Sequence, residues 1–161
     1  MRNKVVVYVT GLLLLAGIGI ASAVRAADDP SSGTWKLNVA KSKFSPGPAP
    51  KSSTVTIKIE NGTETYSAEN VDAMGNTTQG AFTAKLDGTE APVSGIPYAD
   101  TVSIKRMSSH HLIATLKKGG TVMMTVHVVI AADGMSRRLT YDGKNAEGKA
   151  EHDVLVFDKQ M

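Results

Sequence analysis

The chain of 161 residues contains no cysteine, only 5% aromatic residues and a single tryptophan, Trp35. Without cysteine it can form no disulfide bonds, so a hydrophobic core and hydrogen bonds must hold the folded domain. A lipid anchor attached to a cysteine thiol is excluded for the same reason. The scarcity of aromatic side chains leaves aliphatic residues as the main material for a core or for a ligand pocket.

The first 26 residues have the layout of a signal peptide. A basic start, Met1–Lys4, precedes an apolar run from Val5 to about Ala23, and Ala21-Ser22-Ala23 and Val24-Arg25-Ala26 offer two cleavage sites. An uncleaved membrane anchor is the alternative, because a run of about 19 apolar residues is just long enough to span a bilayer. The glycines of the run and its alanine-rich end favour cleavage. We expect residues 27–161 to form one exported domain, periplasmic or secreted, without a membrane span.

The formal net charge of +3 comes from this leader. Arg2, Lys4 and Arg25 lie within it, and it contains no acidic residue. The remaining chain has 15 basic and 15 acidic side chains, so its net charge is near zero. Nucleic-acid-binding domains carry an excess of positive charge, and the balance here argues against a nucleic-acid partner.

No stretch after the leader repeats its apolar residues with the helical period of 3.6, whereas alternation of apolar and polar residues is frequent. Val55, Ile57 and Ile59 share one face, and Asn61-Gly62 after them is a typical hairpin turn. The Pro-rich segment 42–51 is expected to be extended, either crossing one end of the fold or acting as a spacer. A turn is expected at Asp87-Gly88 and a loop-rich passage over residues 91–98. Candidate strands cover residues 35–39, 55–60, 63–71, 78–86, 101–107, 110–117, 120–131, 136–141 and 151–158.

This pattern predicts an all-β domain, an antiparallel up-and-down barrel of about 8–10 strands, with a β-sandwich as the alternative. A closed barrel leaves no strand edge exposed, which suits strands rich in valine and threonine. The residues expected to face the interior are Val55, Ile57, Ile59, Phe82, Leu86, Val102, Ile104, Leu112, Leu116, Val122, Met124, Val126 and Val128.

The stretch Gly33-Thr34-Trp35-Lys36-Leu37 resembles the first strand of the lipocalin and fatty-acid-binding superfamily, the calycins, in which Gly-x-Trp begins the barrel. The resemblance implies that Gly33 and Trp35 lie at a barrel end, where the tryptophan packs across the closed end beneath a basic residue. Together with Lys41–Phe44 and Gly95–Val102, the stretch is most similar to exported bacterial lipocalin-like proteins of unassigned function.

The chain departs from the fatty-acid-binding proteins at two places. Those proteins insert two helices between their first two strands, and the Pro-rich segment cannot form them. Their last strand carries an Arg-x-Tyr pair that holds a carboxylate, and Glu151-His152-Asp153-Val154 has no such pair. The resemblance therefore implies the fold only, and it does not carry the ligand chemistry of that carboxylate site to this chain.

Neither a metal site nor a catalytic group is expected. Adjacent strand residues point to opposite faces, so His110 and His111 cannot share one metal ion, and no acidic residue lies at ligand spacing from His127 or His152. Ser108-Ser109-His110-His111 lacks a third group to orient a catalytic base, and no glycine-rich loop precedes a helix. We therefore predict no cofactor and no enzymatic activity.

Arg137 and Tyr141 share one face of their candidate strand, and together they could hold an anionic group inside a barrel. Two alternatives remain for Arg137: it could cover Trp35 at the barrel end, or it could lie in water.

The main hypothesis is a protein that binds a small hydrophobic or amphipathic ligand in the barrel interior. The alternative is a ligand-free structural or protein-interaction domain of the cell envelope. Ligand pockets have volumes of several hundred Å³, so a cavity below about 100 Å³ would favour the alternative. The sequence leaves the oligomeric state open. The expected ligand-binding residues are Phe82, Val102, Ile104, Met124, Val126, Arg137 and Tyr141.

Overall fold

The computed structural model describes residues 29–144 and 147–161. The predicted signal peptide, residues 1–26, therefore lies outside the described residues. A single 3₁₀ turn, Val39–Lys41, is the only helix within them. The ten strands of the described residues are β1 (Gly33–Leu37), β2 (Ser52–Glu60), β3 (Thr63–Val71), β4 (Thr77–Lys85), β5 (Asp87–Ser94), β6 (Thr101–Ser108), β7 (His111–Lys118), β8 (Thr121–Ile130), β9 (Ser136–Lys144) and β10 (Ala150–Lys159).

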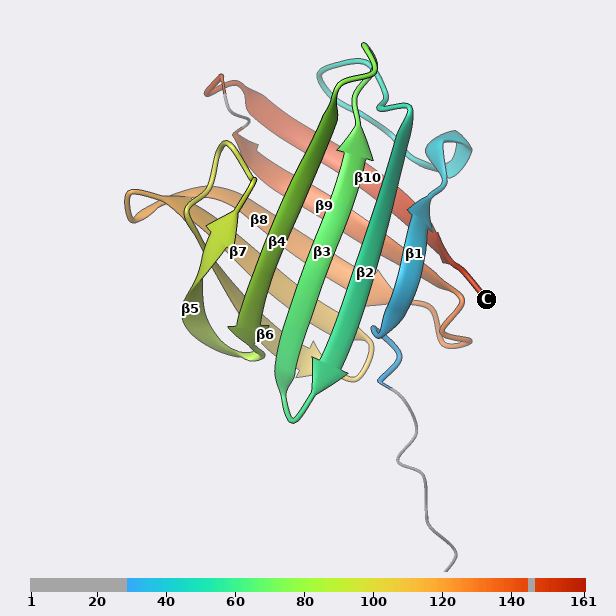
Figure 1. Ribbon diagram of the computed structural model, residues 1–161, viewed down its shortest axis with the longest axis vertical. Coiled ribbons are helices and arrows are strands. Elements are labelled where there is room, and N and C mark those ends of the chain that lie inside the picture. The colour runs from blue at the N-terminus through green and yellow to red at the C-terminus, as the bar shows by residue number, and fades with distance from the viewer. Residues whose placement is uncertain (1–28, 145–146) are drawn as a thin grey trace, which may run out of the picture.

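These strands form one closed antiparallel barrel in up-and-down order. Each strand pairs with its neighbours in sequence, and β1 closes the barrel by pairing with β10. Figure 1 shows β1 to β4 crossing in front of β7 to β10, with the interior between them. The prediction of an antiparallel up-and-down barrel is confirmed, and the sandwich alternative is wrong. Because the sheet is closed, none of its strands presents a free edge along its whole length.

The strand β5 was not expected, since the sequence predicts a turn at Asp87-Gly88 and a loop-rich passage over residues 91–98. The strand contains Pro92, which cannot donate a backbone hydrogen bond, and its residues are mostly exposed. It pairs with β6, but with β4 only through Ala81–Ser94 and Phe82–Val93. This weak pairing explains why the local sequence lacks a clear strand pattern.

The prediction that Val122 faces the interior is also wrong, because 53% of its surface is exposed. The register of β7 and β8 shifts here: Leu116 pairs with Met124, but the next residue, Lys117, pairs with Val122. The β-bulge leaves Met123 without a partner and turns Val122 to the outer face. The other residues predicted for the interior are buried or pack against the core: Val55, Ile57, Ile59, Phe82, Leu86, Val102, Ile104, Leu112, Leu116, Met124, Val126 and Val128.

The Pro-rich segment begins beside β10, beyond the end of β1. The backbone N–H of Lys43 donates to the carbonyl of Val154 at 2.7 Å, and Val154 donates back at 2.9 Å. One residue pair further along, His152 donates to the carbonyl of Ser45 at 2.9 Å. The start of the segment thus covers the part of β10 that the short β1 does not reach.

Gly143 lies inside β9, beyond the end of the candidate strand 136–141 that the sequence predicts. It pairs with Met124 of β8 and with Glu151 of β10. A Cβ atom at this position would lie 2.1 Å from the carbonyl oxygen of Met123 and 2.7 Å from the Cα of Met124. The backbones of β8 and β9 therefore approach each other at a distance that only glycine permits.

We expect Gly143→Ala to lower the free energy of unfolding by about 1–3 kcal/mol, as overpacking against a backbone does. Urea unfolding followed by Trp35 fluorescence measures the change. Lys144→Ala, at the next and exposed position, is the matched control and should change stability by less than about 0.5 kcal/mol. Equal unfolding midpoints for the two variants would contradict the close approach.

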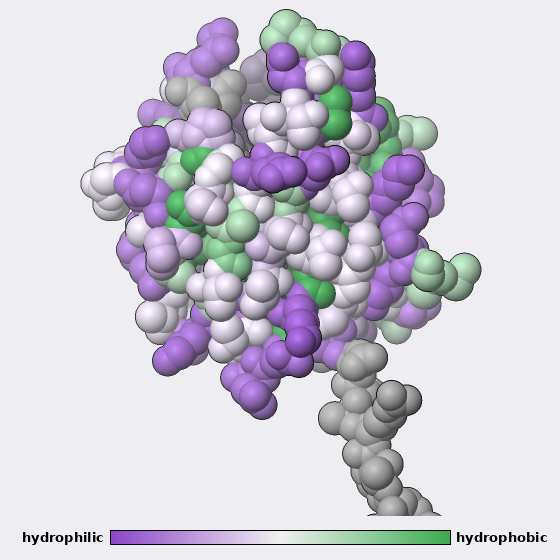
Figure 2. All heavy atoms as spheres, viewed as in Figure 1, coloured by the Kyte–Doolittle hydropathy of each residue, from purple (hydrophilic) through white to green (hydrophobic). Residues whose placement is uncertain are grey.

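The outer face of β2, β3 and β4 has a composition distinct from the interior. Its exposed residues include Thr54, Thr56, Thr65, Ser67 and Thr83. Figure 2 shows this face as largely neutral in hydropathy, with hydrophilic residues around its margins. The apolar side chains of these strands therefore point into the barrel. Of the residues that the structure describes, none belongs to a helix long and apolar enough for a membrane crossing.

Candidate functional site in the barrel interior

One end of the barrel is closed by Trp35 and by the residues just before β1. Trp35 is fully buried, and its indole Nε1 donates to the carbonyl oxygen of Ser31 at 2.9 Å. The hydroxyl of Ser32 accepts a hydrogen bond from the backbone N–H of Ile59 at 3.0 Å. These bonds tie residues 31 and 32 across the barrel end, beneath the interior cavity.

Gly33 begins β1 at the same end. A Cβ atom here would lie 2.6 Å from Cε of Lys159, whose ammonium nitrogen is 5.1 Å from the centre of the Trp35 ring. The absence of a side chain at Gly33 therefore lets Lys159 reach the tryptophan. Both residues of the Gly-x-Trp motif lie at the barrel end, as the resemblance implies.

Arg137 lies between two aromatic rings. Its guanidinium carbon is 5.1 Å from the centre of the Trp35 ring and 5.0 Å from that of Phe157, distances typical of cation–π interactions. Only 4% of the residue is exposed. Arg137 therefore covers Trp35, and it does not lie in bulk water. The remaining alternative, an anion site shared with Tyr141, is compatible with this position, because both residues also line the cavity.

Glu64 faces the same end of the cavity from β3, and 6% of it is exposed. Burial raises the pKa of its carboxyl group to about 7, although the positive charges of Arg137 and Arg106 lower it and the carboxylate of Asp29 adds to the rise. Arg106 itself has a partner, because its Nη2 lies 2.7 Å from Oδ2 of Asp29, a short contact not aligned as a hydrogen bond. Arg137, in contrast to Arg106, has no acidic side chain in direct contact.

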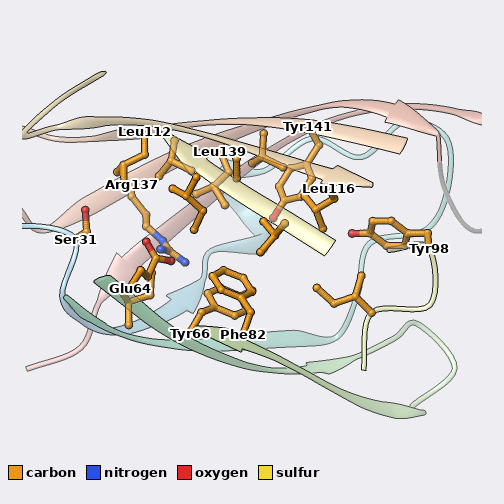
Figure 3. Close-up of a pocket in the computed structure, with 17 residues that line it drawn as sticks. Ser31, Glu64, Tyr66, Phe82, Tyr98, Leu112, Leu116, Arg137, Leu139 and Tyr141 are labelled. Carbon is orange, nitrogen blue, oxygen red and sulfur yellow. The ribbon is translucent and has the colours of Figure 1, made fainter. Parts of the chain in front are cut away.

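Neither Glu64 nor Arg137 forms a side-chain hydrogen bond or ion pair with any other residue that the structure describes. The Nε of Arg137 and the hydroxyl oxygen of Ser31 are fully buried without a partner. Figure 3 shows the carboxyl group of Glu64 and the guanidinium of Arg137 pointing toward each other at the end of the pocket where Ser31 lies. Buried polar groups without partners are costly, so this end of the cavity is suited to a polar guest.

The cavity above this end has a volume of about 100 Å³. Aliphatic side chains from β6 to β9 form one wall, among them Leu112, Leu116 and Leu139. On another side the rings of Tyr66 and Phe82 stack in parallel, with their centres 4.5 Å apart. Ten strands enclose a wider interior than the eight of a small, fully packed barrel, which leaves room for such a cavity.

A cleft of about 250 Å³ adjoins the cavity. The two share Tyr66, Ile96, Tyr98, Arg137, Leu139 and Tyr141 as lining residues. The cleft ends at Glu151 and Asp153 on β10, far along the strand from the closed end. The two volumes together fall at the lower end of the range found for small-molecule sites, about 300–1,000 Å³.

Glu151 and Asp153 give the mouth of the cleft an acidic character. Partial burial raises the pKa of both carboxyl groups, and Asp153 raises that of Glu151 further. Oδ1 of Asp153 accepts a hydrogen bond from the backbone N–H of Ser45 at 2.7 Å, which ties the Pro-rich segment to the mouth. The interior thus has polar groups at both ends and apolar walls between them.

Three of the four tyrosines of the chain line this interior, and the fourth is Tyr8 of the leader. Burial raises the pKa of Tyr66 and Tyr141, and raises that of Tyr98 to about 12, so their phenols stay neutral near pH 7. No hydrogen bond joins these hydroxyl groups to other described residues. The few aromatic residues of the chain are therefore concentrated where a ligand could contact them.

The structure brings most of the predicted ligand-binding residues together around the deep cavity. Met124 is the exception: it is fully buried but packs in the core and does not line the cavity. The sequence analysis missed Glu64, Tyr66 and Tyr98. The predicted residues that line the cavity are Phe82, Val102, Ile104, Val126, Arg137 and Tyr141.

The histidines lie away from this interior. The rings of His111 and His127 stack with centres 5.9 Å apart, and His127 is exposed, as the alternation of β8 predicts. His152 contacts Asp142 on the outer face. Across residues 29–144 and 147–161, no group of three or more histidine, cysteine, aspartate or glutamate side chains could hold a metal ion.

A scan of the chain against protein-family models found no match, and neither did a search of curated proteins. The closed ten-strand antiparallel barrel fits a calycin-like barrel. A function for this chain must therefore be inferred from its fold and from the chemistry of its interior.

Proposed function

We propose that this chain is a lipocalin-like protein that binds a small amphipathic molecule inside its barrel. The observation that carries the proposal is the interior itself, in which a cavity and a cleft share six lining residues and combine apolar walls with buried polar groups that have no partner. Ligand sites in proteins typically have this composition, mostly apolar with a few placed polar groups.

The polar groups favour an amphipathic ligand over a purely apolar one. A hydrocarbon would gain contacts with Leu112, Leu116 and Leu139, but it would leave Glu64 and Arg137 buried without partners. A ligand with one polar end satisfies both requirements. The even charge balance after the leader supports a small molecule over a nucleic acid, and no constellation for covalent catalysis lies in the interior, so we propose binding without chemistry.

A ligand-free structural domain is the second candidate. The deep cavity measures only about 100 Å³, which is the size at which a packed core becomes a reasonable description. The adjoining cleft of about 250 Å³ favours binding, because a ligand could occupy both spaces.

We also propose that residues 1–26 direct export and are removed, so that the barrel works in the periplasm or outside the cell. The basic start, the apolar run and the small residues at its end support this. The N-terminal sequence of the protein recovered from the periplasm or the medium tests it. A chain that keeps residues 1–26 in the membrane fraction would overturn it.

The binding proposal is tested with purified residues 27–161, a neutral lipophilic dye and native mass spectrometry. We expect the dye to bind with a micromolar dissociation constant, about −8 kcal/mol. Ala114→Phe should abolish binding, since it fills the deep cavity from β7. Ile113→Phe, at the neighbouring position on the opposite face of the strand, is the matched control and should bind as the parent does. If no dye binds and no ligand accompanies the protein, the structural alternative stands.

A further inference from the structure

Glu64 and Arg137 project from different parts of the barrel into one end of the cavity. Glu64 belongs to β3 and Arg137 to β9, and the two are 6% and 4% exposed. Neither has a hydrogen-bond or ion-pair partner among the described residues, and the Nε of Arg137 is buried without an acceptor. Two buried side chains of opposite charge thus face each other across a cavity without direct contact (Figure 3).

We propose that Glu64 and Arg137 together hold the carboxylate of a monocarboxylic amphiphile, which rests on the proposed ligand-binding function. The guanidinium of Arg137 donates hydrogen bonds to the ligand carboxylate, and the carboxyl group of Glu64, carrying its proton, donates the O–H. The apolar body of the ligand lies along Leu112 and Leu139 and points toward the cleft.

The charges around the site select the ligand. Arg106 is neutralised by Asp29, and Tyr66, two residues from Glu64 on the same face of β3, is an uncharged phenol. With Glu64 protonated, Arg137 is the one buried charge left that lines the cavity, and a single anion balances it. With Glu64 ionised, the site is already neutral, and a second carboxylate would be repelled in a region of low dielectric constant.

Binding of a carboxylate at this site therefore depends on the protonation of Glu64 near neutral pH. Burial raises the pKa of Glu64 to about 7 in the ligand-free protein, and a bound carboxylate would raise it further. Asp29, Arg106, Arg137 and Tyr66 are the other titratable or charged groups near Glu64. Burial raises the pKa of the Tyr66 phenol, and it brings the pKa of Glu64 to about 7. Binding of the anion then takes up one proton above pH 7 and none well below it.

Isothermal titration of residues 27–161 with decanoate and with 1-decanol tests the proposal. Decanoate is ionised throughout the range from pH 5.5 to pH 8.5, because carboxylic acids titrate near pH 4–5. We expect its affinity to fall about 30-fold over this range, since only the fraction of protein with protonated Glu64 binds it. The affinity for 1-decanol should change by less than about 3-fold, because an alcohol carries no charge.

The wild-type protein also allows a direct measurement of the proton. Titrations at pH 8.0 in two buffers with different ionisation enthalpies give the number of protons taken up on binding. We expect about one for decanoate and about zero for 1-decanol. This measurement needs no variant, so it decides the matter even if a substitution prevents folding.

The variant Glu64→Gln tests whether Glu64 causes the pH dependence of decanoate binding. The amide is neutral at every pH and keeps an N–H donor, so this variant should bind decanoate at pH 8.5 as the parent does at pH 5.5. The matched control is the double variant Glu151→Gln/Asp153→Asn, which removes the acids at the mouth and should keep the 30-fold dependence. If Glu151 and Asp153 cause the pH dependence of decanoate binding instead, the double variant should lose it and Glu64→Gln should keep it.

The outcomes separate this inference from the proposed function. Binding of 1-decanol together with decanoate binding that is independent of pH overturns the carboxylate site and leaves the ligand-binding function intact. Proton uptake near zero on decanoate binding also overturns the carboxylate site and leaves the ligand-binding function intact. Absence of binding for both compounds and for the neutral dye overturns the function, and the inference with it.

Discussion

Replacing Trp35 with alanine is expected to lower the free energy of unfolding by about 3–5 kcal/mol, as for other buried large-to-small aromatic substitutions. Trp35 is fully buried, so the loss combines the transfer of a large ring with the cavity left behind. The carbonyl of Ser31 would also lose its indole donor, and Arg137 would lose one of its two aromatic neighbours. For a single domain of this size, such a loss is a large part of the whole stability.

Urea unfolding followed by circular dichroism measures the change, since the variant has no tryptophan to observe. Trp35→Phe is the control, because it keeps an aromatic ring against Arg137 and removes only the indole N–H and part of the volume. It should lose clearly less stability than Trp35→Ala. If the alanine variant unfolds at the same urea concentration as the parent, Trp35 does not close the barrel.

The second large effect is a dependence of stability on pH that comes from Glu64. Its pKa rises from 4.5 to about 7 on folding, so the folded protein holds the proton more tightly than the unfolded chain does. Stability from this group is therefore fully present below pH 4.5 and is lost as the pH rises to about 7. At about 1.4 kcal/mol per pKa unit, the loss amounts to about 3 kcal/mol.

Urea unfolding of parent and Glu64→Gln between pH 4.5 and pH 8 measures this contribution. The amide does not titrate, so the variant should gain stability relative to the parent as the pH rises, by about 3 kcal/mol at pH 8. Glu151 and Asp153 change stability in the same direction, but they are present in both proteins, so the difference between the two curves belongs to Glu64. Parallel curves would show that the carboxyl group of Glu64 has an ordinary pKa in the folded protein.

The barrel could be predicted from the sequence because alternation and turn residues are local signals. Asn61-Gly62 marks the turn between β2 and β3, and both residues adopt the positive φ angles that such a two-residue turn needs. The errors arose where distant strands decide the outcome. The orientation of Val122 depends on a bulge in its pairing with β7, and β5 is a strand because β6 pairs with it.

The apolar lining of the site could be predicted for the same reason, whereas its polar groups could not. Glu64 and Tyr66 share the inner face of β3 with Ala68. The alternation along the strand shows that the three lie on one face. An acidic residue is almost always exposed, so its residue type gives no reason to expect Glu64 on the inner face. Tyr98 lies in the loop after β5, and its position over the cavity follows from the path of that loop, which has no local signal.

The pairing of β1 with β10 has a consequence for how the chain reaches its folded state. The amide of Asn38 donates to the carboxylate of Asp158 at 2.7 Å, a contact between residues separated by 120 positions. Contacts so distant in sequence carry a large entropy of closure, and they slow folding. Until the last strand is available, β1 and β9 each have an unsatisfied edge, so the barrel cannot close on a nascent chain. We therefore expect closure to be the last step of assembly, and we expect a chain that lacks β10 to form an open, aggregation-prone sheet.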